Sequence, residues 1–177
     1  MKDEPTEHSG QRIGRGMYIA MWLVVLALLT MGFNHWLERE RNPNRNPQGL
    51  VSADGALEVT LQRSRHGHYL ASGYINGQPV TFLLDTGASD VSIPAAVASR
   101  LGLERGAPRQ YRTANGIVTA YLTQLHRVEL GPLELAGVRA SINPHMDGEE
   151  ILLGMSFLRE LEMIQRGDSL TLRQPTR

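Results

Sequence analysis

The sequence predicts a mostly β protein: a closed antiparallel β-barrel domain with one or two short helices, preceded by a single N-terminal transmembrane helix. Three observations predict this fold class. After residue 56, short runs of apolar residues alternate with polar ones at the period of two that is typical of strands. Clusters of turn-forming residues separate these runs. Near the N-terminus, residues 17–33 contain no charged side chain.

Residues 17–37 are predicted to be an uncleaved membrane anchor. About 20 mostly apolar residues span a bilayer, and Tyr18 and Trp36 stand where interfacial aromatic residues are expected. One alternative is a signal peptide, but no Ala-x-Ala cleavage site follows the apolar run. The other is a buried core helix, but such a helix normally has a polar face, whereas this segment is apolar all round. Residues 1–16 are predicted to be a polar tail, and residues 38–55, with their Asn and Pro, a linker.

The domain over residues 56–177 is predicted to consist of short strands and little helix. Asn-Gly pairs at residues 76–77 and 115–116 predict two tight hairpin turns. The strand-like runs cover residues 57–61, 69–75, 80–84, two runs within 111–128, 138–142, 151–153, 161–165 and 170–173, and a helix is expected over 95–101.

Charge and composition exclude several classes of function. Lys plus Arg and Asp plus Glu each number 18, so no bulk attraction to nucleic acid is expected. The chain has no cysteine, which excludes disulfides, thiolate zinc sites and a cysteine nucleophile. His66 and His68 lack a third ligand and predict an exposed turn rather than a metal site. We therefore expect no metal and no cofactor.

The most informative motif is Leu-Leu-Asp-Thr-Gly-Ala-Ser at residues 83–89. Asp85 emerges from a short apolar run directly into a turn of small residues. Asp and Gly are ordinary turn residues, so a strand that simply ends in a turn is the alternative. The flanks favour a functional loop: a predicted hairpin precedes it, residues 91–94 and a short helix follow it, and a second apolar run ending in glycine occurs at residues 151–158.

This ordered set of motifs resembles the retropepsin-like (clan AA) aspartic proteases, especially their membrane-anchored bacterial type. The resemblance covers roughly residues 56–173 and implies a retropepsin-like barrel. It implies that Asp85 is the catalytic carboxylate and that Thr86 braces two paired loops across a twofold axis. Gly87 would permit the tight turn and a close approach of the substrate backbone.

The resemblance also suggests residues that bind substrate. Ala88 and Ser89 would complete the loop, and Asp90 either lines a subsite or faces solvent. The hairpin at Asn115 and Gly116 lies where such proteases carry a flap, although an ordinary surface hairpin is the alternative.

One further position matches the family, and two differ from its retroviral members. Gly154 matches the glycine that packs behind the catalytic loop. Retroviral members usually have an acidic residue at the place of Ser89 and an arginine at that of Met155; the loss of both charges is coherent, because a lone buried charge is costly.

Hydrolysis by carboxylates needs two of them close together, one ionised and one protonated. The chain has one Asp-Thr-Gly, and neither Asp147 nor Asp168 follows an apolar strand as Asp85 does. The second carboxylate is therefore expected to be Asp85 of another copy, in a homodimer with a twofold axis.

The function predicted is thus a membrane-anchored aspartic endopeptidase acting on protein or peptide substrates. A non-catalytic peptide- or protein-binding module of the same fold is the alternative; a purely structural scaffold has no need of Asp85. Basic residues on the two sides of the anchor balance, so the orientation comes from the resemblance alone. It implies a single-pass protein of the bacterial inner membrane with a periplasmic protease domain.

Overall fold

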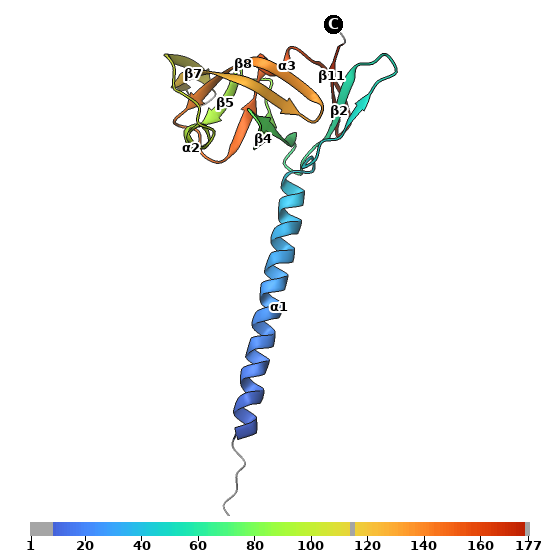
Figure 1. Ribbon diagram of the computed structural model, residues 1–177, viewed down its shortest axis with the longest axis vertical. Helices are drawn as coiled ribbons and strands as arrows, with labels where there is room; N and C mark the ends of the chain where they lie inside the picture. The colour runs from blue at the N-terminus through green and yellow to red at the C-terminus, as the bar shows by residue number, and fades with distance from the viewer. Residues whose placement is uncertain (1–8, 114–115, 176–177) are drawn as a thin grey trace, which may run out of the picture. The chain divides into compact units, whose positions relative to one another are not determined.

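The computed structural model describes the backbone of residues 9–113 and 116–175. The chain divides into two compact units, Met1–Arg39 and Glu40–Arg177. The first unit contains most of one long helix, and the second contains all the strands, as Figure 1 shows.

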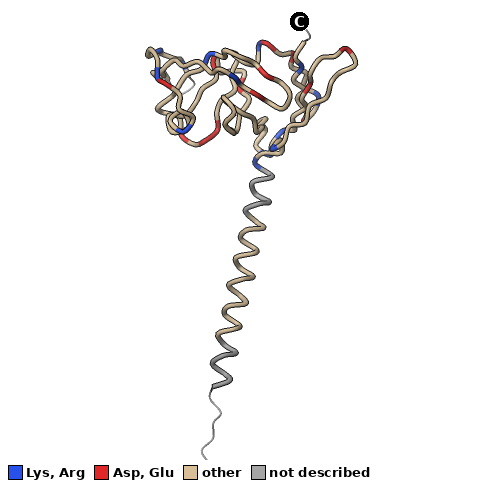
Figure 2. Tube along the Cα trace, in the orientation of Figure 1, with Lys and Arg blue, Asp and Glu red and all other residues tan. Residues whose placement is uncertain are grey.

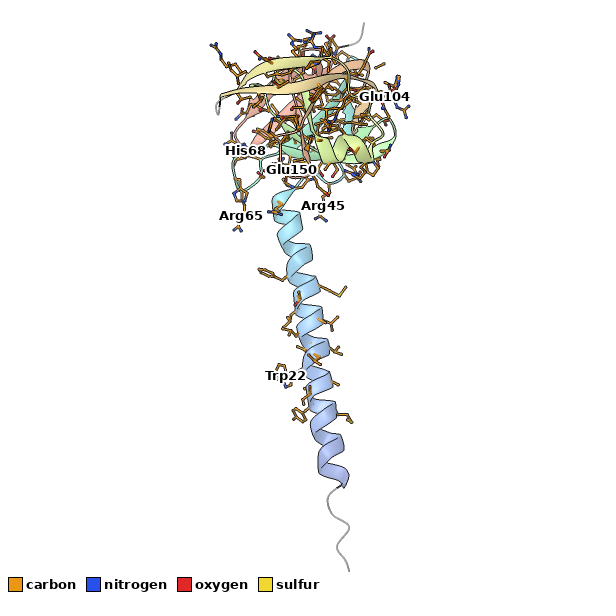
Figure 3. All side chains as sticks on the ribbon, turned by 90° about the vertical axis from the view of Figure 1, so that its left-hand side faces the viewer. Trp22, Arg45, Arg65, His68, Glu104 and Glu150 are labelled. Carbon is orange, nitrogen blue, oxygen red and sulfur yellow. The ribbon has the colours of Figure 1, made fainter. Side chains whose placement is uncertain are left out.

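Helix α1 spans Ser9–Arg41 and is longer at both ends than the predicted anchor of residues 17–37. Its segment Gly16–Phe33 has a mean hydropathy of 2.0 and is not buried, and Figure 2 shows no charged residue along it. Side chains project from this segment on all sides, Trp22 among them (Figure 3). By length and composition the helix can cross a membrane, a test that a signal sequence also passes.

A polar side chain within this apolar segment is satisfied inside the helix. The hydroxyl of Thr30 donates to the carbonyl oxygen of Leu26, 2.8 Å away and one turn earlier. The segment therefore offers apolar surface around its whole circumference, as hydrocarbon requires.

The larger sheet of the second unit closes on itself. Its strand order is β3-β4-β9-β5-β8-β7-β6, and β3 also pairs with β7. Six strands thus form a ring, and β6 is attached outside it to β7. The strands are β3 (Leu70–Ile75), β4 (Gln78–Leu84), β5 (Val91–Pro94), β6 (Pro108–Thr113), β7 (Gly116–Leu130), β8 (Leu133–Asn143) and β9 (Glu150–Leu153). The mostly β closed barrel predicted from the sequence is confirmed.

The barrel is mixed rather than purely antiparallel, which corrects the sequence prediction. Strand β4 pairs with β9 in parallel, and β5 pairs with β8 in parallel. Strand β9 lies between β4 and β5, which are consecutive in the chain. Parallel partners need long connections, so their pairing depends on residues far apart in sequence that no local pattern can reveal.

A second sheet has the order β1-β2-β11-β10 and is antiparallel throughout. Two short helices complete the unit: α2 (Ala95–Arg100), close to the predicted 95–101, and α3 (Met155–Leu158) directly after β9. The strands of this sheet are β1 (Gly49–Val51), β2 (Leu57–Gln62), β10 (Glu162–Arg166) and β11 (Ser169–Gln174).

The core of the β unit is formed by side chains that alternate inward along the strands. Phe82 of β4, Ile93 of β5 and Leu153 of β9 are fully buried, as are Phe157 and Leu158 of α3. Burial of apolar surface is the main favourable contribution to folding. Because Phe82, Leu153 and Ile93 flank the loop that joins β4 to β5, this core fixes the ends of that loop.

Residues 42–51 belong to the β unit, which corrects the prediction of a linker over residues 38–55. Asn44 is buried, and its side-chain amide donates to the carbonyl oxygens of Gln62 and Leu70, at 2.9 and 2.7 Å. Its side-chain oxygen accepts a 2.7 Å hydrogen bond from the amide of Gln62. An asparagine that satisfies backbone groups of two strands looks like any other turn residue in the sequence, which is why composition suggested a linker.

We expect Asn44→Ala to destabilise the β unit by about 2–4 kcal/mol, because the backbone groups of Gln62 and Leu70 would lose their partners while remaining shielded from water. The measurement is denaturant-induced unfolding of the two proteins under identical conditions. Asn46→Ala, at an exposed position, is the control and should change stability by less than about 0.5 kcal/mol. Equal effects of the two substitutions would refute the structural role of Asn44.

Candidate active site

The aspartate of the Asp-Thr-Gly motif lies at the end of a buried parallel strand pair. In the register of β4 with β9, Leu84 is opposite Leu153. The amide of Asp85, the next residue, donates to the carbonyl oxygen of Leu153 at 3.2 Å. The chain then crosses the end of β9 to reach β5, so the sheet itself delivers Asp85 to the loop.

Backbone groups of the loop orient the Asp85 carboxylate. The amide of Gly87 donates to Asp85 Oδ1 at 2.8 Å, and the amide of Ala88 donates to the carbonyl oxygen of Asp85 at 3.2 Å. A Cβ at position 87 would lie 3.1 Å from the same Oδ1, closer than ordinary packing. Glycine at this position therefore keeps the space beside the carboxylate open.

The segment after β9 supports the loop from behind. The amide of Met155 donates to the carbonyl oxygen of Ala88 at 2.8 Å, and the amide of Ser156 donates to that of Ser89 at 3.0 Å. A Cβ at Gly154 would lie 2.3 Å from the carbonyl oxygen of Asp90 and 2.6 Å from that of Ala88. Gly154 thus has the packing role expected from the sequence.

Ser156 is a supporting residue that the sequence analysis did not identify. Its buried hydroxyl donates to the carbonyl oxygen of Arg139 at 2.7 Å and accepts from the amide of Val91 at 3.0 Å. It therefore joins β8, β5 and α3 directly beneath the loop. No local pattern marks a serine in a short helix for this role.

The loop is open to solvent on its outer side. Thr86, Gly87 and Ser89 are exposed, and Asp85 and Ala88 are half-buried. The predicted residues 85–89 are thus together in one loop with an accessible carboxylate.

Asp90 differs from its neighbours, because it does not face solvent, which was one of the two alternatives predicted for it. Its side chain is only 1 % exposed. Arg139 Nε donates to Asp90 Oδ1 at 2.6 Å, and the hydroxyl of Tyr111 donates to Asp90 Oδ2 at 2.7 Å. Both carboxylate oxygens are therefore engaged within the domain, since a buried charge requires a partner.

These contacts change the ionisation of both partners of Asp90. Burial, followed by the hydrogen bond to Asp90, raises the pKa of the Tyr111 hydroxyl above its usual value. The hydrogen bond to Asp90, reinforced by the opposite charge, raises the pKa of the Arg139 guanidinium. At neutral pH Tyr111 therefore keeps the proton that it donates.

The predicted flap is a real hairpin. Strands β6 and β7 pair with Thr113 opposite Gly116, and the Thr113 hydroxyl donates to the carbonyl oxygen of Gly116 at 2.9 Å. Gly116 is exposed and has a φ of +115°, a backbone conformation that residues with a side chain rarely adopt. Asn115, the other predicted flap residue, lies outside the described residues.

In the described part of the chain, no three His, Cys, Asp or Glu side chains come close enough to hold a metal ion. His66 and His68 are exposed and belong to the segment between β2 and β3, where Figure 3 labels His68. A groove of about 1000 Å³ lies beside β8 and α3 and is lined by Arg139 and Ser156 among others, but Asp85 does not line it.

Comparison with known proteins agrees with this geometry. Residues 71–160 match the family described as gag-polyprotein putative aspartyl protease. The chain belongs to this aspartyl protease family. The match includes β4, the Asp-Thr-Gly loop, the hairpin and β9 with α3.

A solved structure has a similar fold. It is a retropepsin-like aspartic protease from Rickettsia conorii, 29% identical, with a TM-score of 0.58 over 67% of this chain and 92% of that one. The retropepsin-like fold expected from the sequence is therefore confirmed.

Two curated relatives carry no assigned function. An uncharacterised protein from the cobV 5′ region of a Sinorhizobium species is 33% identical over 178 residues, covering 93% of this chain and 76% of the relative. An uncharacterised protein of Rickettsia prowazekii (strain Madrid E) is 28% identical over 152 residues. That match covers 81% of this chain but only 64% of the length of the relative.

Proposed function

We propose that the protein is a membrane-anchored aspartic endopeptidase that hydrolyses peptide bonds as a homodimer. The observation that carries the proposal is the Asp85 carboxylate, oriented by the amide of Gly87 at 2.8 Å in a loop that is otherwise open to solvent. Ordinary turns also contain an Asp that accepts from the amide two residues later. What supports a catalytic role is this contact in a loop that opens directly from the parallel pair of β4 and β9 and is supported from behind by Gly154 and Met155.

The chemistry requires two such carboxylates that share one proton, because like charges so close cannot both ionise cheaply. The ionised Asp85 takes a proton from a water molecule as its oxygen attacks the peptide carbonyl carbon. The protonated Asp85 of the second copy gives its proton to the carbonyl oxygen. The C–N bond then breaks as the first Asp85 gives the proton it took from water to the nitrogen and the ionised Asp85 of the second copy takes a proton from a hydroxyl of the tetrahedral intermediate. The amine and the carboxylic acid leave, and the dyad again holds one proton.

The exposure of the loop supports a second copy at the site. Thr86, Gly87 and Ser89 are exposed in the single chain, although they surround the reactive group. A twofold axis beside the loop would bring two Asp85 side chains together and form a cleft between the copies.

In this proposal the remaining loop and hairpin residues hold the substrate. Thr86 braces the two loops across the axis, and Ala88 and Ser89 contact the substrate backbone. The hairpin tip at Asn115 and Gly116 covers the bound peptide and excludes water.

Helix α1 supports the proposed membrane anchoring, since its apolar segment is long enough to span a bilayer. Resemblance to the anchored bacterial type favours the inner membrane with the protease domain in the periplasm. Substrates would then be periplasmic or membrane-proximal proteins. Anchoring in one plane raises the effective concentration of the two copies and favours the dimer.

The test uses the full chain in detergent micelles, incubated with a diverse peptide library from acidic to neutral pH. Mass spectrometry records the cleavage products. We expect hydrolysis whose rate rises with the square of chain concentration at low concentration, because two copies form one site. A rate strictly proportional to chain concentration down to the lowest measurable value, with a monomer in solution, would exclude a shared dyad. If a folded, dimeric protein cleaves nothing, a peptide-binding module of the same fold becomes the better conclusion.

A further inference from the structure

The hairpin formed by β6 and the first half of β7, which we call the flap hairpin, is joined to the catalytic loop by a side-chain contact that secondary structure does not explain. In the described part of the chain β6 pairs as a strand with β7 alone. Its residues are exposed except Tyr111, which is half-buried. Tyr111 is thus the one side chain of β6 drawn into the domain.

The contact reaches a buried charge beside the active loop. Tyr111 donates to Asp90 Oδ2 at 2.7 Å, and Asp90 comes directly after the loop of residues 85–89. The backbone of Asp90 is fixed as well, because Gly154 packs against its carbonyl oxygen. A displacement of Tyr111 would therefore leave one oxygen of a buried carboxylate without its donor.

Arg139 fixes the orientation of the Asp90 carboxylate. In the parallel register of β5 with β8, Val91 is opposite Ala140. Asp90, the residue just before β5, therefore lies beside Arg139 of β8. Arg139 binds Asp90 Oδ1 at 2.6 Å and leaves Oδ2 turned toward Tyr111. The acceptor is thus held in place by the barrel, while its donor belongs to the hairpin.

The Tyr111 ring is also covered on its hairpin side. The guanidinium of Arg109, two residues earlier and hence on the same face of β6, lies 5.5 Å from the ring centroid. This contact orders the ring within the hairpin, so that the hydroxyl and the hairpin move together.

We propose that Tyr111 and Asp90 form a latch that holds the flap hairpin over the catalytic loop, and that Tyr111 is a positioning residue for substrate binding. The inference rests on the proposed function for its effect on catalysis, but the latch itself is independent of it. Substrate binding would select the latched hairpin, so weakening the latch lowers apparent affinity by reducing the population of the binding-competent state.

The test compares wild type, Tyr111→Phe and Tyr74→Phe as full chains in detergent micelles. Tyr111→Phe removes only the hydroxyl, and Tyr74, exposed on β3, supplies a matched control. Hydrogen exchange measured by mass spectrometry is the first readout. We expect exchange of the hairpin amides to accelerate about tenfold in Tyr111→Phe, with that of β10 and β11 unchanged and the control equal to wild type.

Kinetics on a cleaved peptide are the second readout. We expect KM to rise in Tyr111→Phe, by at most the factor by which hairpin exchange accelerates, with kcat within about twofold, since the dyad is untouched. In a double-mutant cycle, Tyr111→Phe should have a smaller effect on hairpin exchange when Asp90 is already Asn.

The latch is refuted if hairpin exchange in Tyr111→Phe stays within twofold of wild type, or if exchange rises equally throughout the domain. If the protein cleaves no peptide but exchange of the hairpin amides still accelerates in Tyr111→Phe, the latch is supported and only the proposed protease activity is contradicted. The two failures are thereby distinguishable.

Discussion

Asp85→Asn is expected to abolish peptide hydrolysis, by a factor on the order of 10³ or more, while the fold and the dimer persist. General acid–base catalysis by a positioned group contributes about 10²–10⁴-fold, and in the proposed mechanism the carboxylate pair performs both roles. Asparagine has the same shape and its side-chain oxygen can still accept from the amide of Gly87, so the loop keeps its support. Initial rates and size-exclusion chromatography of both proteins check this result.

A mixing experiment makes the prediction specific for a shared dyad. If wild-type and Asp85→Asn chains pair at random, the activity per wild-type chain falls to about half at equal amounts and to about one tenth with a ninefold excess of the variant. Each mixed dimer holds one carboxylate and cannot share a proton. Activity that depends only on the amount of wild-type chain would show that each subunit acts alone.

The conformation of the Asp-Thr-Gly loop could be predicted because its signal is local. Asp85 follows an apolar strand, and the glycine that shapes the turn is two residues away in the sequence. Most barrel strands could also be predicted, since periodicity and Asn-Gly turns are properties of short windows. The predicted run over residues 138–142 is too short, because β8 begins at Leu133.

What the sequence did not reveal depends on partners far apart in the chain. The parallel pairings of β4 with β9 and of β5 with β8 connect residues about 50 to 70 positions apart. Asn44 lies in a segment with the composition of a linker, yet its amide is bound by two distant strands. The burial of Asp90 could not be read either, because its partners Tyr111 and Arg139 come from two other strands.

The same positions refine the comparison with retroviral enzymes. The sequence lacks an acidic residue at Ser89 and an arginine at Met155, a joint loss that is coherent because a lone buried charge is costly. The structure instead has a buried ion pair one residue further along, between Asp90 and Arg139. A charge beside the loop is therefore present, held by β8 rather than by the segment after β9.

Gly154→Ala is expected to have the second large effect, on folding and on activity together. The added methyl would lie 2.3 Å from the carbonyl oxygen of Asp90 and 2.6 Å from that of Ala88. These are backbone atoms of the loop, so no side-chain rotation relieves the contact. Overpacking typically costs about 1–3 kcal/mol, and a backbone clash on two sides belongs at or above the upper end of that range. Denaturant unfolding measures it.

The substitution also separates the support of the loop from its chemistry. Moving the loop away from position 154 lengthens the hydrogen bonds from Met155 to Ala88 and from Ser156 to Ser89, so Asp85 loses its placement even in molecules that remain folded. Activity should therefore fall further than the folded fraction does. Gly32→Ala is the matched control, because a Cβ there meets nothing within 4 Å. If Gly154→Ala were as stable and active as that control, the packing of β9 and α3 against the loop would not be what positions the carboxylate.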